Sequence, residues 1–114
     1  MKRWLLLLLL LVPLAFANTP GQVTVTLTWN ASPTAGVTYN VYRGSATGVC
    51  SGIPTPIKTG LSVLTFIDTN VTSGQTYVYA VTAVKGGESA CSNEAQVTVP
   101  TIPAPPSSLQ ATSP

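Results

Sequence analysis

Histidine is absent from this 114-residue sequence, and charged residues make up only 7% of it. Acid–base catalysis usually relies on histidine or on paired carboxylates, and the three acidic residues, Asp68, Glu88 and Glu94, show no spacing that would bring two of them together. With no histidine and only two cysteines, a zinc site is also excluded. We therefore expect a protein that is not an enzyme, with no catalytic residue, cofactor or metal.

Positive charge is equally scarce. Two of the five basic residues, Lys2 and Arg3, belong to the leader described below, and the other three balance the three acidic residues, for a net charge of zero (3 minus 3). Without a basic patch the chain has nothing to neutralise phosphates, so we expect no nucleic-acid partner and no membrane partner in the mature form. A net charge near zero also lowers the electrostatic barrier to self-association.

The long apolar run lies at the N-terminus and has the features of a signal peptide. Met1–Arg3 supplies the positive start, Trp4–Leu14 the apolar stretch, and Ala15–Ala17 the small-x-small cleavage pattern. The run is shorter than the roughly 20 residues of a membrane span, and Pro13 interrupts it. We predict a signal peptide over residues 1–17 and a secreted, extracellular protein.

The two cysteines, Cys50 and Cys91, are a candidate disulfide because an oxidising compartment lets such a bond persist. In the chain-entropy model, closing a loop of about 40 residues, as between these two cysteines, stabilises a fold by roughly 4 kcal/mol. Two buried thiols are the alternative.

Several short segments alternate apolar and polar residues with a period of two, which predicts strands with one buried face. No segment shows a helical period. The strands are expected from Val23 to Trp29, from Val37 to Arg43, around Leu64 and Phe66 up to Asp68, from Tyr77 to Ala83, and from Ala95 to Val99. Short strands separated by turn residues predict an all-β, immunoglobulin-like sandwich of two sheets.

The sequence from about Val23 to Val99 resembles the fibronectin type III domain of secreted bacterial proteins. The segments that carry the resemblance are, in order, Leu27-Thr28-Trp29, Tyr39-Asn40-Val41-Tyr42-Arg43, Phe66-Ile67-Asp68 and Gly74 to Val84. The resemblance implies one domain over residues 23–100 and a tyrosine corner, in which the hydroxyl of Tyr77 bonds back to the preceding chain. It also implies a core between the sheets that contains Trp29, Tyr39, Val41, Phe66, Tyr77 and Tyr79.

The sequence departs from this family at both ends. The first strand of such a domain, strand A, has no counterpart in the short N-terminal segment 18–22, which has no apolar residue to bury. The Pro/Ser-rich tail over residues 101–114 instead resembles a strand A, with Leu109 and Ala111 as its inward-facing pair.

Three interpretations of the tail stay open. It inserts as a donor strand into a neighbouring copy, which would build a head-to-tail filament. It is the start of a further domain in a tandem array. It folds back on its own domain, which requires residues 100–108 to span the whole sandwich if the two ends of the domain lie at opposite poles.

Two functions follow from these interpretations. The first is a structural or interaction protein, with itself or another extracellular protein as partner. The alternative is a module of a tandem array that acts in adhesion or as an accessory to a carbohydrate enzyme. A sugar-binding platform would need exposed aromatic residues, and of the strand aromatics only Tyr42 is expected to point outward.

Overall fold

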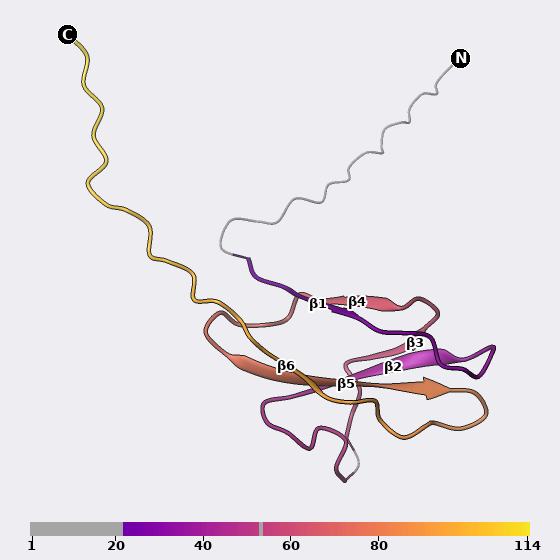
Figure 1. Cartoon of the computed structure of the whole chain (residues 1–114). Helices are drawn as coiled ribbons and strands as arrows, with labels where there is room; N and C mark the ends of the chain where they lie inside the picture. The colour runs from indigo at the N-terminus through magenta and orange to yellow at the C-terminus, as the bar shows by residue number, and fades with distance from the viewer. Residues whose placement is uncertain (1–21, 53) are drawn as a thin grey trace, which may run out of the picture.

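The computed structural model describes residues 22–52 and 54–114, so the predicted signal peptide and nearly all of segment 18–22 lie outside the described residues (Figure 1). The described chain contains six strands and no helix, and accordingly no helix there could cross a membrane. The strands are β1 (Val25–Thr28), β2 (Thr38–Gly44), β3 (Lys58–Leu61), β4 (Thr65–Asp68), β5 (Thr76–Val84) and β6 (Ala95–Thr98).

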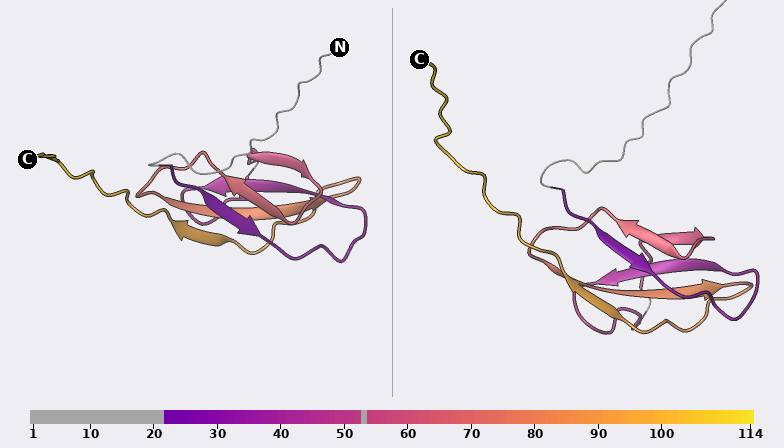
Figure 2. Two further views of the ribbon diagram at one scale, coloured as in Figure 1. Left: turned by 90° about the horizontal axis from the view of Figure 1, so that it is seen from above. Right: turned by 45° about the horizontal axis from the view of Figure 1, so that its top comes forward.

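The strands form two antiparallel sheets that pack face to face, as the two views of Figure 2 show. One sheet contains β1 and β4, and the other has the order β3-β2-β5-β6. The longest pairing joins β2 to β5 over seven residues, from Thr38 opposite Val84 to Gly44 opposite Val78. The all-β sandwich predicted from the sequence is confirmed.

The core lies between the sheets, where alternation places every second side chain of the longer strands. Its buried members are Val25, Val41, Tyr79 and Val99. Tyr39 is also buried, while Trp29, Phe66 and Tyr77 are half-buried and pack against the core from its edges. Trp29, which was expected in the core, is therefore only partly enclosed between the two sheets.

The outer face of the four-stranded sheet is covered by the long loop between β2 and β3. Figure 1 shows this loop on the side of β5 that faces away from β1 and β4. Tyr42, which was expected to be exposed, is only 5% exposed, and Val78 and Ala80 beside it are buried. The alternation assigned Tyr42 to the correct face, but the expectation of exposure was wrong because Cys50 and Pro54 of the loop lie over that face.

Strand β3 was not predicted from the sequence. Three of its four residues are exposed and only Leu61 is half-buried, so the strand carries no alternating apolar pattern. Gly60 has a positive φ of 69°, and the pairing register of β2 with β3 shifts between Tyr39 and Val41. The strand is held through main-chain pairing to β2, which composition does not reveal.

The first strand starts and the last strand ends at the same pole of the sandwich, since Thr24 and Pro100 line one cleft. The expectation of opposite poles was therefore wrong, because β1 starts at the pole where β6 ends. The tail from Thr101 to Pro114 has no regular structure, and all its residues are exposed. It extends away from the sheets in both views of Figure 2 and does not fold back on its own domain.

Candidate functional site

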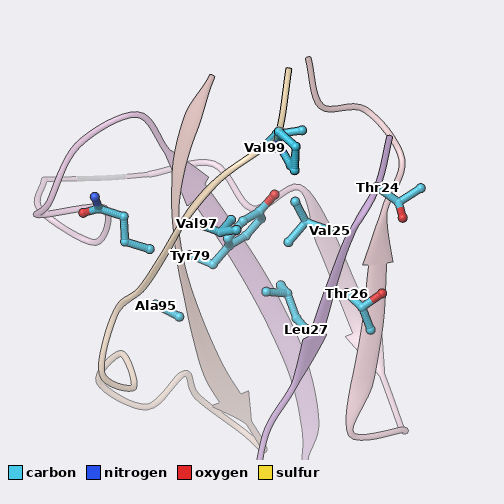
Figure 3. Close-up of a pocket in the computed structure, with 10 residues that line it drawn as sticks. Thr24, Val25, Thr26, Leu27, Tyr79, Ala95, Val97 and Val99 are labelled. Carbon is cyan, nitrogen blue, oxygen red and sulfur yellow. The ribbon is translucent and has the colours of Figure 1, made fainter. Parts of the chain in front are cut away.

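A groove lined mainly by apolar side chains runs between β1 and β6. Its larger part is a cleft of about 270 Å³. Figure 3 shows Val25 and Leu27 of β1 pointing into the cleft toward Tyr79 and Val97, whereas Thr24 and Thr26 turn away from it. Ala95, Val99 and Pro100 complete the wall formed by the last strand and the residues after it.

The groove continues past Leu27 toward Trp29. A smaller cleft of about 90 Å³ shares Leu27 and Ala95 with the first and is also lined by Trp29 and Asn93. The indole ring of Trp29 lies edge-on to the ring of Tyr39 at 5.7 Å between centroids, and its buried Nε1 has no hydrogen-bond partner. The groove therefore follows the whole of β1 and ends at the half-buried Trp29, which packs on the buried Tyr39.

One edge of β1 has no strand beside it in the described part of the chain, where β1 pairs with β4 alone. The N–H of Trp29 donates to the carbonyl of Leu64, on the β4 side, at 3.1 Å. Because alternate residues of an antiparallel strand turn their main-chain groups to the same side, the N–H and C=O groups of Thr26 and Thr28 face the groove. The groove thus combines apolar side chains with unpaired main-chain donors and acceptors.

A buried carboxylate joins the two sheets at the pole where the tail leaves. Oδ2 of Asp68 accepts hydrogen bonds from Nη1 of Arg43 and from the hydroxyl of Tyr79, both at 2.7 Å. Oδ1 accepts from the N–H of Asn70 at 3.0 Å. The Arg43 guanidinium also lies over the ring of Tyr77, 5.6 Å from its centroid.

These contacts set the charge states of the cluster. Burial alone would raise the pKa of Asp68, but the hydrogen bonds from Tyr79, Arg43 and Asn70 outweigh burial and hold that pKa below its usual value. Burial, followed by the bond to Asp68, raises the pKa of Tyr79. Asp68 is therefore an ionised, fully paired structural group, and a raised carboxyl pKa of the kind that suits a general acid is not found here.

A second carboxylate holds the turn between β5 and β6 against the outer face. Oε2 of Glu88 accepts hydrogen bonds from the hydroxyl of Tyr42, from Oγ1 of Thr82 at 2.5 Å and from Nδ2 of Asn40 at 3.3 Å. The bonds from Thr82 and Tyr42 lower the pKa of Glu88, and the bond to Glu88 together with burial raises the pKa of Tyr42. The Tyr42 hydroxyl is bonded to Glu88 and its side chain is buried, so its ring face is not available for a sugar to stack on.

The predicted disulfide is present in the structure. It joins Cys50 to Cys91 with 6.5 Å between their Cα atoms. Close by, Oε2 of Glu94 accepts hydrogen bonds from the main-chain N–H groups of Gly48 and Val49 at 2.8 and 2.7 Å. The disulfide and Glu94 together explain how the long loop reaches the start of the β6 segment.

The tyrosine corner implied by the family resemblance is present. The hydroxyl of Tyr77 accepts a hydrogen bond at 2.9 Å from the N–H of Thr72, five residues earlier. The proposed donor residues Leu109 and Ala111 lie in the exposed tail, which extends away from the sheets (Figure 2). Within residues 22–52 and 54–114, no group of three metal-ligating side chains occurs.

The sequence pattern did not indicate the Asp68 and Glu88 clusters. Both carboxylates stand beside turns, where an acidic residue is ordinarily a solvated turn residue. Arg43 and Tyr79 lie 25 and 11 residues from Asp68, so their convergence depends on strand register. The signal that could have pointed to it was the placement of Arg43 among inward-facing residues of its strand.

The chain matches a solved structure over most of its length, although no protein-family model matches it. That structure is the crystal structure of a Fn3-like protein from Clostridium thermocellum, with 38% identity and a TM-score of 0.59. The match covers 76% of this chain and 86% of the other. The chain belongs to the Fn3-like family.

Segments of three larger proteins are also similar to this Fn3-like chain. An amylopullulanase of Thermoanaerobacter thermohydrosulfuricus is 44% identical over 78 residues, or 67% of this chain and 5% of the relative. Amylopullulanases of Thermoanaerobacterium saccharolyticum and Thermoanaerobacterium thermosulfurigenes are 37% and 41% identical over 94 and 87 residues, covering 82% and 75% of this chain. The Fn3-like chain spans only 7% and 4% of these two relatives.

Proposed function

We propose that this Fn3-like chain is a secreted, non-catalytic accessory module that works with a carbohydrate enzyme. The observation that carries the proposal is its similarity to short segments, 4% to 7% of the length, of three amylopullulanases. Of the two functions expected from the sequence, the relatives support this alternative more than the filament. The predicted signal peptide and the disulfide support a role outside the cell.

Within that class, the side chains favour a spacer over a carbohydrate-binding module. Sugar rings usually stack on exposed aromatic faces, and every aromatic side chain among the described residues is buried or half-buried. Tyr42, the one candidate, is covered by the loop and bonded to Glu88. We therefore propose that the module positions neighbouring domains and does not itself hold the polymer.

The experiment replaces the matching segment of one of these amylopullulanases either with residues 22–100 of this chain or with a Gly/Ser linker of equal length. We expect the chimaera with this chain to keep the parent's melting temperature and its rate on pullulan, and the linker variant to lose one or both. Equal behaviour of the two variants would contradict a role for a folded module.

Affinity electrophoresis in gels that contain pullulan or soluble starch tests the spacer role separately. We expect this chain to migrate as it does in gels without polysaccharide. Strong retardation would replace the spacer role with carbohydrate binding, and release of reducing sugar by the purified chain would contradict the proposal as a whole.

A further inference from the structure

The groove between β1 and β6 has the properties of a site for an added strand. Val25 and Leu27 present apolar side chains to it, and the main chain of Thr26 and Thr28 faces it without a partner strand in the described chain. An open sheet edge beside an apolar cleft is a liability that sheets normally cover. Strand addition satisfies both features at once, because main-chain bonds supply affinity and alternate side chains fill the pockets.

The same chain carries a segment that suits this groove. In the tail, Leu109 is 94% exposed, the highest value among the exposed large apolar side chains of the described chain. Leu109 and Ala111 alternate with Ser108, Gln110 and Thr112, so an extended conformation gives the segment one apolar and one polar side. This pattern matches the alternation of Val25 and Leu27 across the groove.

We propose that residues 107–113 of one copy bind in the groove of a second copy as a strand antiparallel to β1. In this arrangement Leu109 lies beside Leu27, Ala111 beside Val25, and Gln110 opposite Thr26. The polar side chains then remain on the outer surface with the exposed Thr26. The incoming chain enters at the Trp29 end of the groove, so successive copies are joined head to tail.

A second copy suits the groove better than the chain's own tail. The tail leaves from Pro100, at the Val25 end of the groove, whereas a strand antiparallel to β1 must begin at the Leu27 end. Pro103, Pro105 and Pro106 favour an extended conformation, which carries the chain about 19 Å from the groove over six residues at roughly 3.1 Å per residue. To pair with β1, the chain's own tail would have to turn back over this distance and then run along the whole groove to its Leu27 end.

The test is a cysteine pair in residues 18–114, the predicted mature chain, in the variant Thr26→Cys/Gln110→Cys. Residues directly opposite in an antiparallel pair have Cα atoms about 5.5 Å apart, within the range that a disulfide bridges. The native cysteines are already joined to each other and do not compete. We expect the two introduced cysteines to bond between chains, as identified by peptide mapping, and species of twice and three times the chain mass on non-reducing mass spectrometry.

The matched control is Thr26→Cys/Ile102→Cys, whose second cysteine lies in the tail but outside the proposed strand, and it should form few such bonds. In the chain without added cysteines, Leu109→Asp should weaken self-association by about ten- to a hundredfold in sedimentation experiments, as the loss of one buried leucine contact implies. Ile102→Asp makes the same chemical change outside the strand and should leave association unchanged.

Three results would overturn the inference. The first is a disulfide between the two introduced cysteines of Thr26→Cys/Gln110→Cys within a single chain, which would assign the groove to the chain's own tail. The second is equal cross-linking of the two cysteine pairs. The third is a wild-type chain that sediments as a monomer at all concentrations tested. None of these readouts involves carbohydrate, so the accessory-module proposal stands or fails separately.

Discussion

The guanidinium of Arg43 and the carboxylate of Asp68 meet at 2.7 Å and join the two sheets of the sandwich. Arg43 lies on β2 of the four-stranded sheet, and Asp68 ends β4 of the two-stranded sheet. The Asp68 side chain is 4% exposed and that of Arg43 is 21% exposed, so solvent screens the pair less than an ordinary surface pair. Three further hydrogen bonds, from Tyr79 and Asn70 to Asp68 and from Arg43 to the carbonyl of Asn70, complete the cluster.

We predict that Asp68→Asn lowers the free energy of unfolding by about 2 to 4 kcal/mol, because it leaves the Arg43 charge unpaired and weakens two charge-assisted bonds. Urea unfolding of the single variants Asp68→Asn and Arg43→Met and of the double variant measures the coupling. Additive effects of the two single changes would contradict a direct tie between the sheets.

The cluster also predicts how stability depends on pH. The folded pKa of Asp68 is lowered, so its contribution is fully present above the unfolded pKa of about 3.9 and is lost as the pH falls through the lower folded pKa. We expect the melting temperature of the wild type to fall steeply below about pH 4, and that of Asp68→Asn to fall less. The lowered pKa of Glu88 acts in the same direction, so Glu88→Gln is the comparison that separates the two groups. Parallel curves for wild type and Asp68→Asn would rule out Asp68 as the source.

Much of the fold follows from the alternation of side chains, and the failures have a common physical cause. The strands with a buried face, such as β2 and β5, were predicted because Val41 and Tyr79 recur at the spacing of inward positions. Strand β3 was not predicted, because it is exposed and depends on main-chain pairing with β2. A pattern of side chains reveals a strand only where burial selects those side chains.

The same limit applies to the candidate site. The sequence led us to expect a missing first strand, because segment 18–22 has no apolar residue, and a strand-like tail, because the tail carries Leu109 and Ala111. It did not indicate that β1 starts and β6 ends at one pole, which depends on how these two strands lie beside each other. Nor did it indicate the partners of Asp68, which come from three separate segments.

The disulfide is predicted to stabilise the fold and to protect the outer face of the sheet. Cys50 and Cys91 are 41 residues apart, and closing such a loop contributes about 4 kcal/mol in the chain-entropy model. We expect the variant Cys50→Ala/Cys91→Ala to lose about 3 to 4 kcal/mol in urea unfolding. Hydrogen exchange should also become faster at the amides of Val78 and Ala80, whose side chains are buried on the face of the sheet that the loop covers. A double variant with unchanged exchange at these amides would show that the loop stays in place without the bond.

Trp29 lies where the core meets the open groove. Because Trp29 is half-buried, we expect Trp29→Ala to cost about 2 to 3 kcal/mol, below the roughly 3 to 5 kcal/mol of a fully enclosed aromatic side chain. Trp29→Phe should cost about 1 kcal/mol or less, because its indole Nε1 has no hydrogen bond to lose and a phenyl ring can keep the edge contact with Tyr39. Chemical unfolding of the two variants, followed by circular dichroism, measures both costs. Equal, large losses for the two substitutions would mean that the indole nitrogen takes part in the fold, and a negligible loss for Trp29→Ala would remove Trp29 from the core.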